Sequence, residues 1–254
     1  MGMGNKTVCV VLLTAAMSVA SVSGKAEGLG ISKNLEATES HYSIESSGAG
    51  IGSDQQDAVS KAANLVNQGQ LNQANRLLDE VLNHFAGLMT DNQQTYVSFR
   101  DDKDYRQFVQ ESKSKQINKI TRMHNSFVQA LQLKAFIASS GQEWDTAIRY
   151  LDKKILYAPF EAQPLLEKGY CLVSQGNPQQ GFEAYKKAYA LATAHNSALQ
   201  EKSAALRGMG SAQIELGNLD QATDFFNSSL ELEAGNKVAL SELEYIRRMK
   251  AKGR

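Results

Sequence analysis

Small and large residues alternate with polar ones in a pattern that recurs along the chain from about residue 56 to residue 240. Four positions recur together in each copy: a small residue, a turn residue, a second small residue and a large one. The four sets are Ala62, Ala135, Gly169 and Gly210; Gly69, Gln142, Gly176 and Gly217; Ala74, Ala147, Gly181 and Ala222; and Leu78, Leu151, Tyr185 and Phe226. Successive members of every set are 73, 34 and 41 residues apart, so the chain contains an internal repeat.

Each copy predicts two helices that pack antiparallel across a tight turn. Small residues at the first and third positions let the two backbones approach, and the turn residue supplies a positive φ after the first helix. The large residue at the fourth position fills the space between copies. A single helix pair cannot cover its own apolar face, whereas stacked pairs can. The sequence therefore predicts an all-α solenoid of stacked antiparallel helix pairs.

This pattern resembles that of the tetratricopeptide-repeat family. The clearest copy spans residues 205–234 and carries Leu206, Gly210, Gly217, Ala222, Phe226 and Leu230 at the family positions. Pro159 matches the proline that ends such repeats, whereas Gln142 replaces the turn glycine and Gln213 stands where an aromatic residue is usual. The resemblance implies a superhelix and identifies a fold more specifically than a function.

The unequal spacings predict where the array is interrupted or stretched. Because 73 exceeds 34 by 39, about 39 residues are inserted after the first copy. Because 41 exceeds 34 by seven, about two extra turns lengthen the helix around residues 188–206. The expected organisation is a signal peptide at 1–24, a disordered linker at 25–52, a first repeat at 53–87, a helical insertion at 88–126, three repeats at 127–235 and a C-terminal capping helix at 236–254.

The N-terminal segment has the layout of a secretory signal peptide. Lys6 precedes an uncharged run from residue 7 to residue 22 that ends in small residues. We expect an exported protein, periplasmic or secreted, with a buried N-terminal helix as the alternative. Cleavage removes Cys9 and leaves Cys171 as the only thiol, which excludes an intramolecular disulfide. Burial of Cys171 is favoured over an intermolecular bond.

Composition and motifs narrow the classes of function. Lys plus Arg and Asp plus Glu both number 27 among 254 residues, which argues against nucleic-acid binding and allows at most a peripheral contact with a membrane. The chain has no His-Glu-x-x-His motif, no cysteine pair for zinc, no Gly-x-Ser-x-Gly elbow and no glycine-rich phosphate loop. We therefore expect no catalysis, no metal and no cofactor.

The insertion contains two features that the sequence leaves open. Asp101, Asp102 and Asp104 precede a predicted helix, where they suit N-terminal capping better than a calcium loop. One face of the helix is expected to carry Ile117, Ile120, His124, Phe127 and Leu131. Another face carries a possible basic patch formed by Lys115, Lys119 and Arg122. This patch is either a solvated surface or a contact for an acidic partner.

The first helix of each pair is expected to line a concave face of the solenoid. The candidate groove residues are Gln132, Phe136, Leu166, Tyr170, Arg207 and Ser211. Aromatic rings supply rigid contact area, and the polar side chains suit a peptide backbone or a carboxylate. The alternative is that these side chains pack against a neighbouring repeat. Family members that clamp an acidic C-terminal peptide use Lys and Asn at these positions, and only Arg207 is basic here, so a ligand with apolar side chains is favoured.

The sequence predicts a non-catalytic adaptor or scaffold of the bacterial cell envelope. It would bind a protein or peptide partner on its concave face. Self-assembly into a homo-oligomer is the first alternative. The second is an enzyme that acts on cell-wall material with a site formed by the insertion.

Overall fold

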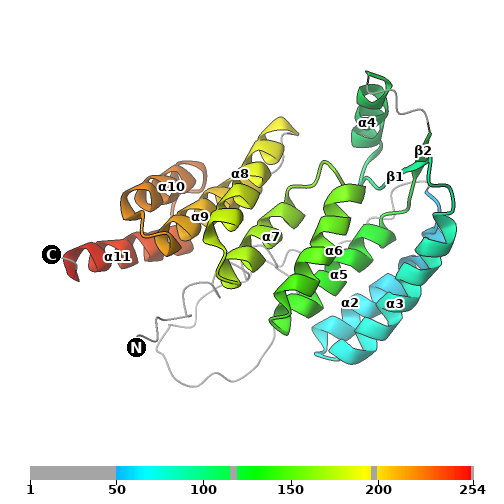
Figure 1. Ribbon diagram of the computed structural model, residues 1–254, viewed down its shortest axis with the longest axis horizontal. Coiled ribbons are helices and arrows are strands. Elements are labelled where there is room, and N and C mark those ends of the chain that lie inside the picture. The colour runs from blue at the N-terminus through cyan, green and yellow to red at the C-terminus, as the bar shows by residue number, and fades with distance from the viewer. Residues whose placement is uncertain (1–49, 115–118, 196–198, 253–254) are drawn as a thin grey trace.

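The computed structural model describes residues 50–114, 119–195 and 199–252, which fold into a helical solenoid (Figure 1). A 3-10 turn, η1 (Ser53–Gln55), opens this part of the chain. The further elements are α2 (Gln56–Asn67), α3 (Leu71–Leu88), β1 (Thr95–Val97), α4 (Asp102–Ser114), β2 (Ile120–Arg122), α5 (Ser126–Ser140), α6 (Trp144–Tyr157), α7 (Gln163–Ser174), α8 (Pro178–Ala194), α9 (Leu199–Glu215), α10 (Leu219–Leu232) and α11 (Lys237–Lys252). The predicted signal peptide and linker up to residue 49 lie outside the described residues.

Consecutive helices form antiparallel pairs that follow one another in a row from α2 and α3 to α11 (Figure 1). The pairs are α2 with α3, α5 with α6, α7 with α8, and α9 with α10. Apolar side chains between the helices form successive core clusters along the array. This arrangement confirms the predicted all-α solenoid of stacked helix pairs.

The turn position of the repeat has the predicted backbone conformation in all four copies. The φ angle is +72° at Gly69, +59° at Gln142, +89° at Gly176 and +81° at Gly217. This left-handed region is strained for a residue with a Cβ, which explains why three copies use glycine. Gln142 is the one described residue other than glycine with a positive φ, so the departure from the family pattern changes the residue and keeps the turn.

The first and fourth positions of the repeat are in direct contact. A Cβ added to Gly169 would lie 2.8 Å from a ring carbon of Tyr185, and one added to Gly210 would lie 2.8 Å from a ring carbon of Phe226. Real Cβ atoms do not approach ring carbons this closely, so each glycine provides the space that the opposite ring occupies. In the earlier copies, Ala62 and Ala135 pair with the smaller side chains Leu78 and Leu151, and all four are buried.

The extra residues before Gly210 do not form one elongated helix. α8 ends at Ala194 and α9 begins at Leu199, and each helix is 17 residues long, compared with 12 residues in α7. The prediction of a single lengthened helix around residues 188–206 is therefore wrong. The added length is shared between the end of one helix and the start of the next.

The insertion predicted to be helical at 88–126 is helical only in part. β1 and β2 pair in parallel, with Thr95 opposite Ile120 and Val97 opposite Arg122, and α4 forms the connection between them. Ile51 continues the ladder beside Met123, so residues 50–52 of the predicted linker are part of the fold. Of the predicted helical face, Ile117 lies outside the described residues; the other members do not share one helix, because Ile120 is in β2 and His124 precedes α5. A strand of three residues leaves no hydropathy period to detect.

We expect alanine at Gly217 to destabilise the protein by about 1–2 kcal/mol, because the left-handed φ is strained for a side chain although the space around it is empty. Gly87 is the matched control, since it also has open space around it but lies inside α3. Gly87→Ala should be neutral or stabilising by up to about 1 kcal/mol. Urea unfolding followed by circular dichroism measures both; equal effects would contradict this account of the turn.

Cys171 is buried, in agreement with the sequence-based expectation. Burial, with the nearby Glu167 carboxylate, raises the pKa of its thiol to about 12. In a Cys9→Ser background we therefore expect no reaction of the native protein with Ellman's reagent at pH 8 and full reaction in urea. A Leu156→Cys variant, placed where the side chain is 67% exposed, is the positive control. Fast labelling of native Cys171 would show that the thiol is accessible and would favour the alternative of an intermolecular disulfide.

Candidate binding site

The six predicted groove residues lie on the first helices of the pairs, but most of them are buried. Gln132 and Phe136 are on α5, Leu166 and Tyr170 on α7, and Arg207 and Ser211 on α9. Only Phe136 is partly exposed; the other five are each at most 9% exposed. Tyr170 packs edge-on against Trp144 with ring centroids 5.9 Å apart. The structure thus favours the packing alternative for Leu166 and Tyr170.

Gln132 belongs to a buried polar network that joins three elements of the array. Its side-chain nitrogen donates to Glu167 Oε2, and its oxygen accepts from Lys154 Nζ at 2.9 Å. Lys154 Nζ also lies 2.9 Å from Glu161 Oε2. Glu161 in turn is 3.3 Å from Arg100 Nε, so the network reaches from α5 to the insertion.

The two buried carboxyl groups of this network are shifted in opposite directions. Burial alone raises the pKa of both Glu161 and Glu167. At Glu161, Lys154 and Arg100 together outweigh burial and hold the pKa below its usual value, so this carboxylate is charged. At Glu167, Lys154 and the side-chain amides of Gln132 and Gln163 compensate burial only in part, and the pKa is raised.

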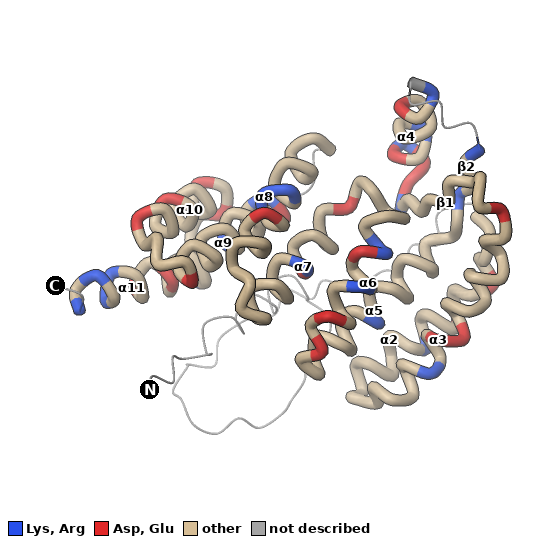
Figure 2. The backbone as a smooth tube through the Cα atoms, viewed as in Figure 1, with Lys and Arg blue, Asp and Glu red and all other residues tan. Residues whose placement is uncertain are grey.

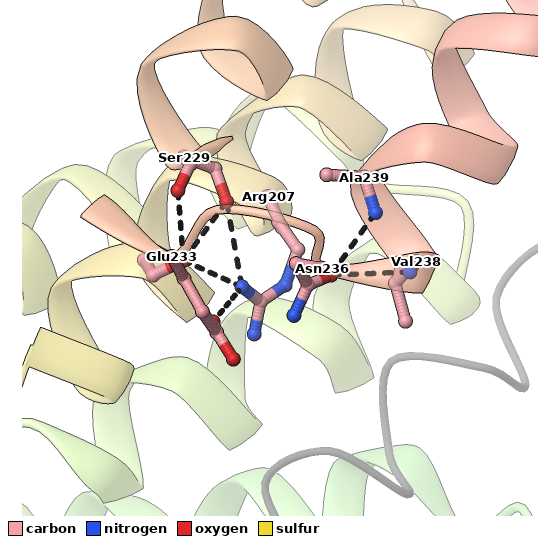
Figure 3. Close-up of polar contacts among 7 residues, drawn as sticks. Arg207, Ser229, Glu233, Asn236, Val238 and Ala239 are labelled. Carbon is pink, nitrogen blue, oxygen red and sulfur yellow. Dashed lines mark hydrogen bonds and ion pairs between the residues drawn. The ribbon is translucent and has the colours of Figure 1, made fainter. Parts of the chain in front are cut away.

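Arg207, one of the predicted groove residues, is engaged within its own repeat. Its Nη1 donates to Ser203 Oγ at 2.6 Å and to Glu233 Oε2 at 2.8 Å, and Ser229 Oγ lies 3.4 Å away (Figure 3). The pairing crosses from α9 to the end of α10. The remaining Nε of Arg207 and the Oγ of Ser211 are buried without a hydrogen-bond partner among the described residues.

The predicted basic patch does not exist as a helical face. Lys115 lies outside the described residues. Lys119 lies beside β2 and pairs with Asp91 at 3.5 Å, while Arg122 lies in β2 and pairs with Asp102. The guanidinium of Arg122 also lies 5.1 Å from the ring centroid of Tyr105. Lys119 and Arg122 thus pair with carboxylates of the insertion, and they do not share a helical face because Arg122 is in β2 and Lys119 precedes it.

A pocket lies where the insertion meets the repeats. Its volume is about 140 Å³, and it is lined by Ser98, Phe99, Arg100, Asp101, Asp104, Ala158, Phe160, Glu161, Gln163 and Glu201. These residues come from three segments: the end of β1 and the start of α4, the connection between α6 and α7, and the first turn of α9. The pocket is therefore assembled by the fold, and no contiguous motif in the sequence signals it.

The pocket is acidic. It has four carboxylate side chains and one cationic one, Arg100, which pairs with Glu161. Asp101 Oδ1 accepts the backbone N–H of Asp104 at 2.8 Å, which confirms the capping interpretation of these aspartates. Burial, followed by the Asp101 carboxylate, raises the pKa of Asp104, and the opposing effects of His195 and Lys103 offset this only in part. Figure 2 shows the acidic residues at the base of α4.

Aromatic rings form the apolar part of the pocket wall. The ring centroids of Phe99 and Phe160 are 5.2 Å apart in an edge-to-face arrangement, and the Phe108 ring is tilted against Phe99 with centroids 5.4 Å apart. His195, at the end of α8, stacks on Phe160 with ring centroids 3.8 Å apart. Aromatic faces beside carboxylates are suited to a cation, which the ring quadrupoles and the negative charges both attract.

The described residues contain no cluster of three or more His, Cys, Asp or Glu side chains that is arranged to hold a metal ion. No helix in the described part of the chain is long and apolar enough to cross a membrane. The pocket combines carboxylate side chains with aromatic rings, which suits it to binding.

Lys154 is expected to be the residue on which the buried network depends. Replacing it by methionine leaves two carboxyl groups buried with one cation fewer, so Lys154→Met should cost about 3–5 kcal/mol. Lys168→Met is the control, because the pair of Lys168 with Asp152 is half-exposed and should contribute less than about 1 kcal/mol. Urea unfolding of both variants tests the comparison; similar losses would show that the network is not critical.

Comparisons with known proteins agree with this architecture. Residues 160–232, which run from the connection before α7 to the end of α10, match the family model described as "Tetratricopeptide repeat". No curated protein sequence is a significant match.

Three solved structures illustrate the similarity. The first tetratricopeptide domain of Spaghetti (RPAP3), bound to an HSP90 peptide, is 21% identical; the match covers 49% of this chain and 93% of that one, with a TM-score of 0.43. The OM64 domain of Arabidopsis is 20% identical, with 48% and 95% covered and a TM-score of 0.43. A type III secretion (T3SS) complex of Aeromonas hydrophila is 16% identical, with 59% and 99% covered and a TM-score of 0.44. The family match covers residues 160–232, and the helix-pair geometry described above extends from α2 to α10.

Proposed function

We propose that this protein is a non-catalytic adaptor that binds a segment of another protein, and that a lysine or arginine side chain of that segment enters the pocket beside α4. The observation that carries the proposal is the pocket itself, in which aromatic rings and unneutralised carboxylates meet. Asp104 and Glu201 both line the pocket and form no salt bridge with another described residue, so a ligand cation can pair with them. The fold is one whose members usually serve as interaction modules.

The position of the pocket favours a peptide over a small molecule. α7 and α9 both begin beside it, since Gln163 and Glu201 are in their first turns. A chain that places one cationic side chain in the pocket therefore has the starts of two repeats within reach. A volume of about 140 Å³ accommodates the end of one side chain, while neighbouring residues of the segment contact the surface around it.

We further propose that the adaptor works outside the cytoplasm of a bacterium, in the periplasm or after secretion. The support is the arrangement of Lys6 followed by an uncharged run and small residues at the N-terminus. A partner in the cell envelope follows from this location.

The proposal is tested by capture of partners from an envelope extract. The bait is the chain from residue 25 onward, compared with an Asp104→Asn, Glu201→Gln double variant. An Asp224→Asn, Glu231→Gln variant is the charge-matched control, because both residues are exposed on α10. We expect a partner that binds the wild type and the control, and that binds the pocket variant at least about tenfold more weakly by titration.

Each other outcome is informative. Equal binding to all three baits would contradict the role of the pocket, and Phe136→Ala would then test the exposed part of α5. Capture of only the chain itself would favour the self-assembly alternative. If the pocket variant still binds more weakly than the wild type in high salt, charge is not the basis of recognition, since an exposed ionic contact is screened by salt.

A further inference from the structure

The C-terminal helix α11 covers the last repeat of the array with one acidic side chain in its buried face. Ala239 and Ile246 of α11 pack with Ile214 of α9 and Phe226 of α10. Glu242 lies between Ala239 and Ile246 on this face and is 8% exposed. Its Oε2 is buried and accepts no hydrogen bond from any described residue. A carboxyl group in an apolar contact without a donor is unfavourable when ionised.

The charged groups around Glu242 do not compensate it. From α9, the Glu215 carboxylate is the neighbour that acts on Glu242, and it has the same sign. From α10, Asp220 is occupied by Lys250 of α11, with 2.6 Å between Nζ and Oδ1. On α11 itself, Arg247 and Arg248 both bind the partly exposed Glu244. No described cation is therefore directed to Glu242.

The protonation state follows from this environment. Burial, followed by the Glu215 carboxylate, raises the pKa of Glu242 to about 7 from an ordinary value near 4.5. The docked helix thus binds a proton more tightly than the undocked helix does. Docking is strongest below pH 4.5, weakens as the pH rises toward 7, and is constant above that, when both forms are ionised.

We propose that α11 is a pH-controlled cap, which docks on the array when Glu242 is protonated and loosens when Glu242 is ionised. The N-terminal end of the helix has its own anchor, because Asn236 Oδ1 accepts the backbone N–H groups of Val238 and Ala239 at 3.1 Å each (Figure 3). Loosening therefore concerns the later turns. It weakens the contacts of Ala239 and Ile246 with Ile214 and Phe226 in the last core cluster.

Hydrogen exchange on the full chain, read by mass spectrometry and corrected for the intrinsic rate, tests this cap. With pKa values of 4.5 and about 7, linkage predicts that the undocked fraction rises about 25-fold between pH 5.5 and pH 8. We expect that increase in peptides covering residues 240–252, and no comparable increase in α7 or α8. Equal protection of α11 at the two pH values would overturn the proposal.

Two variants separate the role of Glu242 from a general effect of charge. Glu242→Gln keeps the shape of the side chain and should leave α11 equally protected at both pH values. Glu244→Gln removes a partly exposed carboxylate from the same helix and should retain the pH dependence of the wild type. If Glu242→Gln still showed the full increase, or Glu244→Gln abolished it, the switch would not be Glu242. Both variants keep the apolar contacts of α11, so folding itself is preserved.

Discussion

The close approach of two helix backbones, with a small residue on one and a large side chain on the other, is the contact on which the array depends. Gly169 faces Tyr185 and Gly210 faces Phe226 at distances that leave no space for a Cβ. The turn residue fixes the direction in which the second helix returns, and all four turns share the same left-handed backbone. Each pair then presents the same surface to the next pair, and stacking follows.

The insertion is attached to this array by polar contacts and by packing of Phe99 on Phe160, without a further helix pair. Arg100 reaches Glu161, and Lys154 joins that carboxylate to Gln132 on α5. Burial of so many charged groups is costly unless each is paired, so these contacts hold the insertion in one position rather than adding much stability. The acidic pocket lies directly beside them because Glu161 belongs to both.

The sequence was sufficient for the parts of the fold that repeat and insufficient for the parts that occur once. The turn and contact positions could be predicted because the same residue types recur at the same spacing in four copies of the repeat. The strands β1 and β2 could not, since three residues carry no period and their pairing partner is 25 residues away in the chain. Arg207 was correctly placed on a first helix, but its partners Ser229 and Glu233 depend on the packing of α10. The pocket combines three distant segments, so no local pattern indicated it.

The packing of the helices determines which of the buried carboxyl groups are ionised. Glu161 has two cations and stays ionised, whereas Glu167 shares one cation with amide groups and its pKa is raised. The Oε2 of Glu242 accepts no hydrogen bond from a described residue, and the charged neighbour that acts on this carboxyl group is the Glu215 carboxylate. The first two lie between elements of the interior, where ionisation cannot be relieved by movement. Glu242 lies on the buried face of α11, the last described helix of the array, while Leu240 and Tyr245 of the same helix are exposed. The same desolvation therefore gives a rigid junction in one place and a titratable contact in the other.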